Sequence, residues 1–196
     1  MWYPFRTMVS DLHSLLEQGY QARREHRLGE AKAIYQQAVD LCEGRHDQIN
    51  LPRAITRLGG IERDLGDLDA SLQQYQQAVS LYRALNEPLA LAHTIRHVGD
   101  ILRESGQPAP ALPCYEEALH IYRNHPETDT LDVANTLRGY ALLNSDLGQI
   151  SEAIESWREA GALYDQAWQE PNSPWKQSDM VPGINESQRQ IALLSA

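Results

Sequence analysis

Arginine is the residue type that gives this chain most of its capacity for chemistry. The chain has 17 cationic residues, and all except Lys32 and Lys176 are Arg. A guanidinium group binds a carboxylate through two parallel hydrogen bonds, which a Lys ammonium group cannot do. Arg23, Arg63 and Arg103 recur at 40-residue steps. This spacing predicts a ladder of guanidinium groups that suits the successive carboxylates of an extended acidic peptide.

A second set of residues has the spacing of metal ligands. His93, His97 and Asp100 lie at positions i, i+4 and i+7, on one face of a helix. Only these three candidate ligands are visible, and His97 could equally bind a peptide carboxylate, so neither a metal nor another cofactor is expected. The sequence has no HExxH motif, no phosphate-binding Gly-rich loop and no recognisable Ser, His and Asp set. It therefore predicts a protein that is not an enzyme.

The elements that must position these residues form an internal repeat. Four segments align on a closing Ala, with spacings of 40, 40 and 42 residues, at Ala38, Ala78, Ala118 and Ala160. In each segment an aromatic residue precedes that Ala by three positions, and a small residue precedes the aromatic by four. The aromatics are Tyr35, Tyr75, Tyr115 and Trp157, and the small residues are Ala31, Ser71, Ala111 and Ala153. The three positions share one helix face, so the aromatics are predicted to lie in the core.

Each repeat is predicted to be a hairpin of two helices. A second apolar stretch precedes each segment and carries a small residue that lets another helix approach, namely Gly19, Gly59, Gly99 or Ala141. The turns between the two helices are predicted at His26, Gly66, Gly106 and Gly148, because Gly adopts the left-handed conformation that ends a helix. Pro88 and Pro126 separate successive hairpins. Three prolines of the third unit are compatible with its second helix if that helix begins near Pro110.

The order of small residue, turn, small residue, aromatic and Ala resembles the tetratricopeptide repeat and covers roughly residues 8–168. The usual repeat has about 34 residues, and longer units such as these resemble those of kinesin light chains. HEAT and armadillo repeats share a period of about 40 residues but lack this signature. The resemblance implies an all-α fold, a right-handed superhelical solenoid of four helical hairpins. The units are expected at about residues 8–45, 46–86, 87–126 and 127–168, within an array spanning residues 1–170.

Residues 171–196 are predicted to form a polar linker and a capping helix, because an open array exposes an apolar face at its last unit. The candidates for this cap are Trp168, Trp175, Met180, Ile184, Ile191 and Leu194. The alternative is that this surface, or the WYPF sequence near the start, mediates self-association as a homodimer.

The first helices of the hairpins are expected to line a concave groove, the usual binding surface of such arrays. The faces assigned to this groove carry eight Arg and five acidic residues, although the whole chain has a net charge of −10. A cationic groove attracts an anionic partner. The predicted ligand-binding residues are Tyr20, Arg23, Arg53, Arg57, Arg63, His93, Arg96, His97, Arg103, Asn135 and Arg138.

The sequence thus predicts a module that binds an extended acidic segment of another protein. A structural role for the Arg ladder is the competing interpretation. A cation near a helix C-terminus is favoured whatever the function, and Asp64, Glu104 and Asp146 could pair with Arg residues of neighbouring units. The positions that escape the dipole explanation are Arg53, Arg57, Arg96 and Arg138. A self-associating adaptor is the second hypothesis, and nucleic-acid binding is disfavoured by the net charge and the scarcity of groove aromatics.

The sequence also predicts where the protein works. No stretch approaches the ~20 apolar residues that a membrane-spanning helix needs, and the start of the chain is too short in apolar residues for a signal peptide. Cys42 and Cys114 are the only cysteines, too few for a disulfide framework. A cytoplasmic protein without a membrane partner is therefore expected.

Overall fold

The computed structural model describes residues 5–169 and 177–195, with side chains from residue 11 to 169 and from 181 to 195. Every regular element in these residues is an α-helix. The helices are α1 (Phe5–Arg24), α2 (Leu28–Gly44), α3 (Leu51–Asp64), α4 (Leu68–Leu85), α5 (Pro88–Glu104), α6 (Pro108–Asn124), α7 (Thr130–Asp146), α8 (Ile150–Gln169) and α9 (Gln177–Leu194). The chain divides into unit 1, residues 1–87, and unit 2, residues 88–196.

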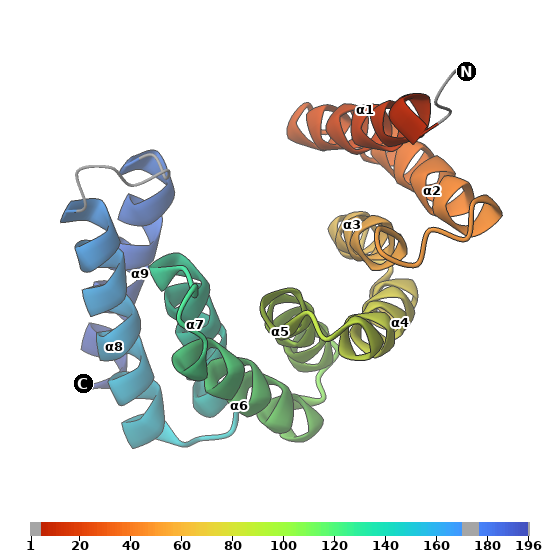
Figure 1. Ribbon diagram of the computed structural model, residues 1–196. Coiled ribbons are helices and arrows are strands. Elements are labelled where there is room, and N and C mark those ends of the chain that lie inside the picture. Colours follow the sequence, from red (N-terminus) through yellow and green to blue (C-terminus); the bar gives the residue numbers. More distant parts are fainter. Residues whose placement is uncertain (1–4, 170–176, 196) are drawn as a thin grey trace. The chain divides into compact units, whose positions relative to one another are not determined.

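Consecutive helices pack in pairs within each unit (Figure 1). In unit 1, α1 packs against α2 and α3 against α4, and α2 also contacts α3. In unit 2, α5 packs against α6 and α7 against α8, while α6 and α5 both contact α7. The predicted all-α fold of four helical hairpins is confirmed.

The turn inside each hairpin has the conformation that the sequence predicted. The turn residue has a φ of 57° at His26, 82° at Gly66, 73° at Gly106 and 74° at Gly148. The residue after each turn donates a backbone hydrogen bond across it, for example Asp67 N to Glu62 O at 2.9 Å. These bonds satisfy carbonyl groups that the end of the first helix leaves unpaired.

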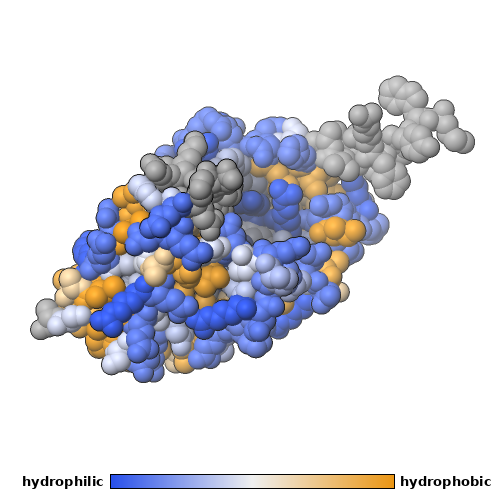
Figure 2. Space-filling view, turned by 60° about the vertical axis from the view of Figure 1, so that its left-hand side comes forward, coloured by the Kyte–Doolittle hydropathy of each residue, from blue (hydrophilic) through white to orange (hydrophobic). Residues whose placement is uncertain are grey.

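The repeating aromatics form the core of the hairpins. Tyr35, Tyr75, Tyr115 and Trp157 are all buried. The small residue of the preceding helix explains how this packing is possible, because a Cβ at Gly19 would lie 2.5 Å from Tyr35 Cε1 and one at Gly99 would lie 3.0 Å from Tyr115 Cε2. The face shown in Figure 2 is mostly hydrophilic, with apolar residues in small separate patches.

Helix α6 begins at Pro108, two residues earlier than expected, and Pro113 lies inside it. Pro108 and Pro110 fall in the first turn, where the missing amide hydrogen removes no helical bond. Pro113 is the sixth residue of the helix and lacks the amide hydrogen that would bond to the Ala109 carbonyl, so it costs the helix one hydrogen bond.

Helix α9 packs against α8, as a cap of the last hairpin would. Ile184 contacts the apolar cluster of α7 and α8, and Ile191 and Leu194 are partly buried. Trp168 is exposed. Trp175, the side chain of Met180 and the WYPF side chains lie outside the described residues.

Candidate functional site

The candidate site has to be described separately in the two units. Tyr20, Arg23, Arg53, Arg57 and Arg63 lie on α1 and α3 of unit 1. The other predicted ligand-binding residues lie on α5 and α7 of unit 2, and they are His93, Arg96, His97, Arg103, Asn135 and Arg138.

In unit 1 the first Arg of the ladder is bound by the next hairpin. Arg23 Nε donates to Asp64 Oδ2 at 2.7 Å, and Arg23 Nη2 donates to Asp64 Oδ1 at 3.1 Å. This two-pronged contact joins the ends of α1 and α3. Arg23 therefore makes the contact between neighbouring hairpins that the structural interpretation anticipated.

Arg53 and Arg57 are differently placed. Both are exposed on α3, and neither forms an ion pair within the part of the chain that the structure describes. Burial raises the pKa of the nearby Tyr82, while the Thr56 hydroxyl, Arg53 and Arg57 oppose that rise. The two guanidinium groups thus border the Tyr82 hydroxyl of α4. Arg63, in the last turn of the same helix, is partly buried.

An open hollow of about 520 Å³ lies beside the end of α1. Its lining includes Tyr20, Arg24, His26 and Leu28, together with the Arg23 and Asp64 pair. Tyr20 is 46% exposed, and the Arg24 guanidinium lies 5.8 Å from the centre of its ring. The hollow presents one aromatic face and cationic groups to solvent.

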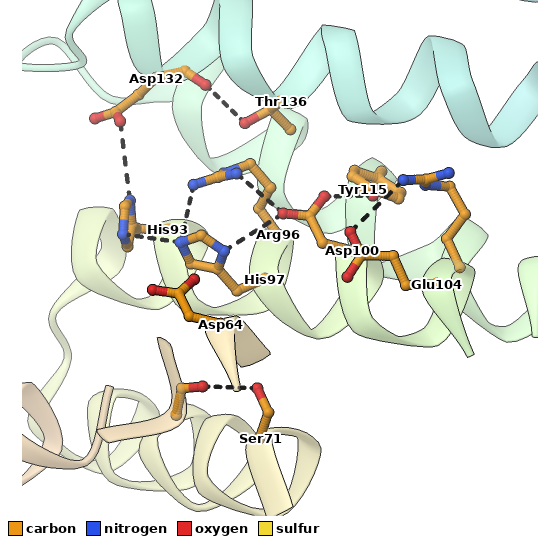
Figure 3. A network of polar contacts seen from close by, with 12 residues as sticks. Asp64, Ser71, His93, Arg96, His97, Asp100, Glu104, Tyr115, Asp132 and Thr136 are labelled. Carbon is orange, nitrogen blue, oxygen red and sulfur yellow. Dashed lines mark hydrogen bonds and ion pairs between the residues drawn. The ribbon is translucent and has the colours of Figure 1, made fainter. Parts of the chain in front are cut away.

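In unit 2 the polar residues of α5 are bound to one another around Asp100 (Figure 3). Asp100 Oδ1 accepts a 2.6 Å hydrogen bond from the Tyr115 hydroxyl, and Asp100 Oδ2 accepts one of 3.1 Å from Arg96 Nη1. Burial opposes ionisation of Asp100, but His97, Arg96 and Tyr115 outweigh it and hold the pKa of this carboxyl well below its usual range. Arg96 is consequently engaged in a buried ion pair.

The two histidines of α5 continue this network. His97 Nδ1 lies 3.4 Å from Asp100 Oδ2, and His97 Nε2 lies 3.0 Å from Arg96 Nη2 and 3.3 Å from His93 Nε2. Burial and the charge of Arg96 lower the pKa of His97 from 6.5 to about 3. His97 is therefore neutral at physiological pH.

The remaining residues of unit 2 also have partners. Arg103 Nη1 donates to Asp146 Oδ2 at 3.3 Å, and Arg138 Nη1 donates to Glu186 Oε2 of α9 at 3.3 Å. Asn135 Oδ1 accepts a 2.8 Å hydrogen bond from the Tyr164 hydroxyl. The cationic surface predicted for α5 and α7 is thus largely neutralised by carboxylates of the same unit.

Sequence reasoning missed three members of these networks. Tyr115 was predicted only as core, and neither Asp132, whose Oδ1 lies 3.9 Å from His93 Nδ1, nor Glu186 was selected. The signal for Glu186 was weak, because it lies 48 residues from Arg138 in a segment outside the repeat pattern.

His93, His97 and Asp100 do not converge on one point, since Asp100 turns to Tyr115 and Arg96. Among residues 11–169 and 181–195, no group of three or more His, Cys, Asp or Glu side chains is arranged to hold a metal ion.

The helical hairpins and their buried small and aromatic residues define a helical-repeat protein. A sequence model of the tetratricopeptide repeat family matches residues 49–124 and 89–166, which is more than half of the chain. The chain therefore belongs to the tetratricopeptide repeat family. Repeats of this family generally mediate protein–protein interaction and typically form non-enzymatic scaffolds. Within the described residues, no helix is long and apolar enough to span a membrane.

Among solved structures, the chain is similar to the crystal structure of BtubC (BKLC) from P. vanneervenii. The TM-score is 0.75 and the sequence identity 12%, with 96% of this chain and 80% of that chain covered. A likeness at this identity shows the fold alone. No curated protein has a matching sequence.

Proposed function

We propose that this chain is a non-enzymatic interaction module that binds an acidic segment of another protein through Arg53 and Arg57 of α3. The observation that carries the proposal is the exposure of these two guanidinium groups without an ion-pair partner among the described residues. The other predicted Arg contacts are already engaged: Arg23, Arg96, Arg103 and Arg138 each have a carboxylate within 3.3 Å, and Arg63 also has a partner. Arg53 and Arg57 are thus the cations best placed to meet an external carboxylate.

The folded chain gains little from this pair by itself. Like charges four residues apart on a helix destabilise it by about 0.2–0.5 kcal/mol. The two acids of α3 are engaged elsewhere, since Asp64 binds Arg23 and Glu62 lies 3.4 Å from Lys32. An external carboxylate would relieve the repulsion, which is why a binding role explains the pair better than a structural one.

The spacing of the pair favours an extended acidic partner. Two residues four positions apart on a helix are separated by about 6 Å along its axis. Alternate residues of an extended strand point to the same side and lie about 6.6–6.8 Å apart. Alternating acidic residues therefore match Arg53 and Arg57, with one carboxylate for each guanidinium.

Fluorescence anisotropy with a labelled (Glu-Ser)4 peptide tests the proposal, with (Gln-Ser)4 as the uncharged comparison. The wild-type protein should bind the Glu peptide, and the affinity should fall as salt is raised because exposed charges are screened. The double variant Arg53→Glu, Arg57→Glu should bind at least about tenfold more weakly, or about 1.4 kcal/mol. Charge reversal of the exposed Arg158 on α8 is the matched control.

Equal binding by wild type and the α3 double variant would refute this site. A labelled oligo-uridine that binds more tightly than the Glu peptide would favour nucleic-acid recognition instead. If the α3 variant and the Arg158→Glu control lose the same affinity for the Glu peptide, the binding depends on overall charge and not on a site on α3.

A further inference from the structure

His93 and His97 of α5 direct the same ring nitrogen at each other. Their Nε2 atoms lie 3.3 Å apart, and the rings meet edge to face with centroids 4.8 Å apart. Two imidazoles that bind one tetrahedral Zn²⁺ at 2.0–2.1 Å have nitrogens about 3.3–3.4 Å apart. The two histidines therefore have the separation of two ligands of a single metal ion.

The opposite nitrogen of each ring faces a carboxylate (Figure 3). His97 Nδ1 lies 3.4 Å from Asp100 Oδ2, and His93 Nδ1 lies 3.9 Å from Asp132 Oδ1. A carboxylate at this position favours the proton on Nδ1 and leaves the lone pair on Nε2, the arrangement usual for metal-binding histidines. The two lone pairs then point at the same position between the rings, and a cation at that position would be bound by both nitrogens.

The charge of the surrounding cluster also favours a cation. Two carboxylates, those of Asp132 and Asp100, face the two imidazole rings, and a divalent cation between the rings is attracted to both. Electrostatic interactions are stronger at this partly buried place than in water. His93 and Asp132 are 44% and 41% exposed, so an ion can reach the site from solvent.

Arg96 competes for the same place. Its Nη2 donates a hydrogen bond to His97 Nε2 at 3.0 Å, whereas its Nη1 donates to Asp100 Oδ2 at 3.1 Å. A metal ion would displace only the first of these bonds. The guanidinium would then keep Asp100, which in turn keeps the orientation of His97.

We propose that His93 and His97 bind one divalent transition-metal ion, Zn²⁺ or Cu²⁺, with water in the remaining coordination positions. Imidazole nitrogen is a favoured ligand of both ions. The site lies within unit 2 and does not depend on the peptide site proposed for unit 1.

Calorimetric titration with ZnCl₂ tests the site in the full chain. One Zn²⁺ should bind per chain, and His93→Gln should weaken the affinity at least tenfold. His120→Gln, a change of another exposed histidine on α6, should leave it unchanged. Absence of binding by the wild type, or equal affinity in wild type and His93→Gln, would overturn the proposal. Electron paramagnetic resonance of bound Cu²⁺ should show two nitrogen ligands in the unaltered protein, and a spectrum with one or none would also overturn it.

Two neighbouring residues give predictions of opposite sign. Asp132→Asn should weaken Zn²⁺ binding by about 10–100-fold, as loss of such supporting carboxylates does, with an unchanged melting temperature of the metal-free protein. Arg96→Gln should tighten binding, because it removes the competing positive charge. Weaker binding by Arg96→Gln together with unchanged binding by Asp132→Asn would overturn the proposed electrostatics.

Discussion

Replacement of Gly139 in α7 by Ala tests how closely the helices of unit 2 approach. A Cβ at Gly139 would lie 2.6 Å from Tyr115 Cε1 and 3.1 Å from Asp100 Oδ1. Ordinary carbon–carbon contacts are about 3.5–4.0 Å, so the ring or the helix must shift by about 1 Å. Tyr115 is fully buried, and its hydroxyl donates a 2.6 Å hydrogen bond to Asp100. The ring therefore cannot move without straining that bond.

Three effects decide the size of the loss. Overpacking of a core costs about 1–3 kcal/mol, and loss of a hydrogen bond to a charged group costs about 1.5–3 kcal/mol. Replacement of Gly by Ala inside a helix returns about 1 kcal/mol through helix propensity. The free energy of unfolding should therefore fall by about 1.5–5 kcal/mol. At about 2–4 °C per kcal/mol for a chain of this length, the melting temperature should fall by at least about 3 °C.

Thermal and urea unfolding followed by circular dichroism measure this effect. Gly29→Ala in α2 is the matched control, because an added Cβ there meets nothing within 4 Å, and its melting temperature should be unchanged or slightly raised. If Gly139→Ala melts at or above the wild-type temperature, the close approach of α7 to Tyr115 does not limit the stability of unit 2, and the reasoning fails.

The other two predictions concern buried titratable groups. Burial raises the pKa of Cys42 to about 11, so a thiol reagent at pH 8 should label the partly exposed Cys114 at least about tenfold faster; equal rates would contradict this. Burial also raises the pKa of Glu62 from 4.5, so this residue's contribution to stability is greatest below pH 4.5 and is lost as the pH rises. Glu62→Gln should consequently stabilise the fold more at pH 8 than at pH 4 in urea unfolding, and the reverse order would refute the burial argument.

The sequence was sufficient to predict the repeat and the hairpins. A period of 40 to 42 residues, an aromatic such as Tyr115 and a small residue such as Gly99 recur in each copy, and each copy must bury the same face. Turn glycines such as Gly106 mark the ends of first helices because few other residues adopt a positive φ. These are local properties, so a single sequence reveals them.

The sequence left the role of the Arg ladder open between ligand binding and pairing with a neighbouring unit. In the structure, two Arg residues of the ladder are paired with carboxylates: Arg23 binds Asp64, and Arg103 binds Asp146. Helical spacing cannot show this, because the paired residues lie 41 and 43 positions apart on separate helices. Whether they meet depends on how one hairpin is rotated and offset against the next.

The sequence of this protein is thus sufficient to predict which apolar residues are buried, because they repeat along each helix at a fixed interval. The partners of the charged residues are decided by tertiary structure, because a guanidinium group reaches any carboxylate within a few ångströms, whichever helix supplies it. For this reason only the packed helices show that Arg96 is paired with a carboxylate, whereas Arg53 and Arg57 form no ion pair among the described residues.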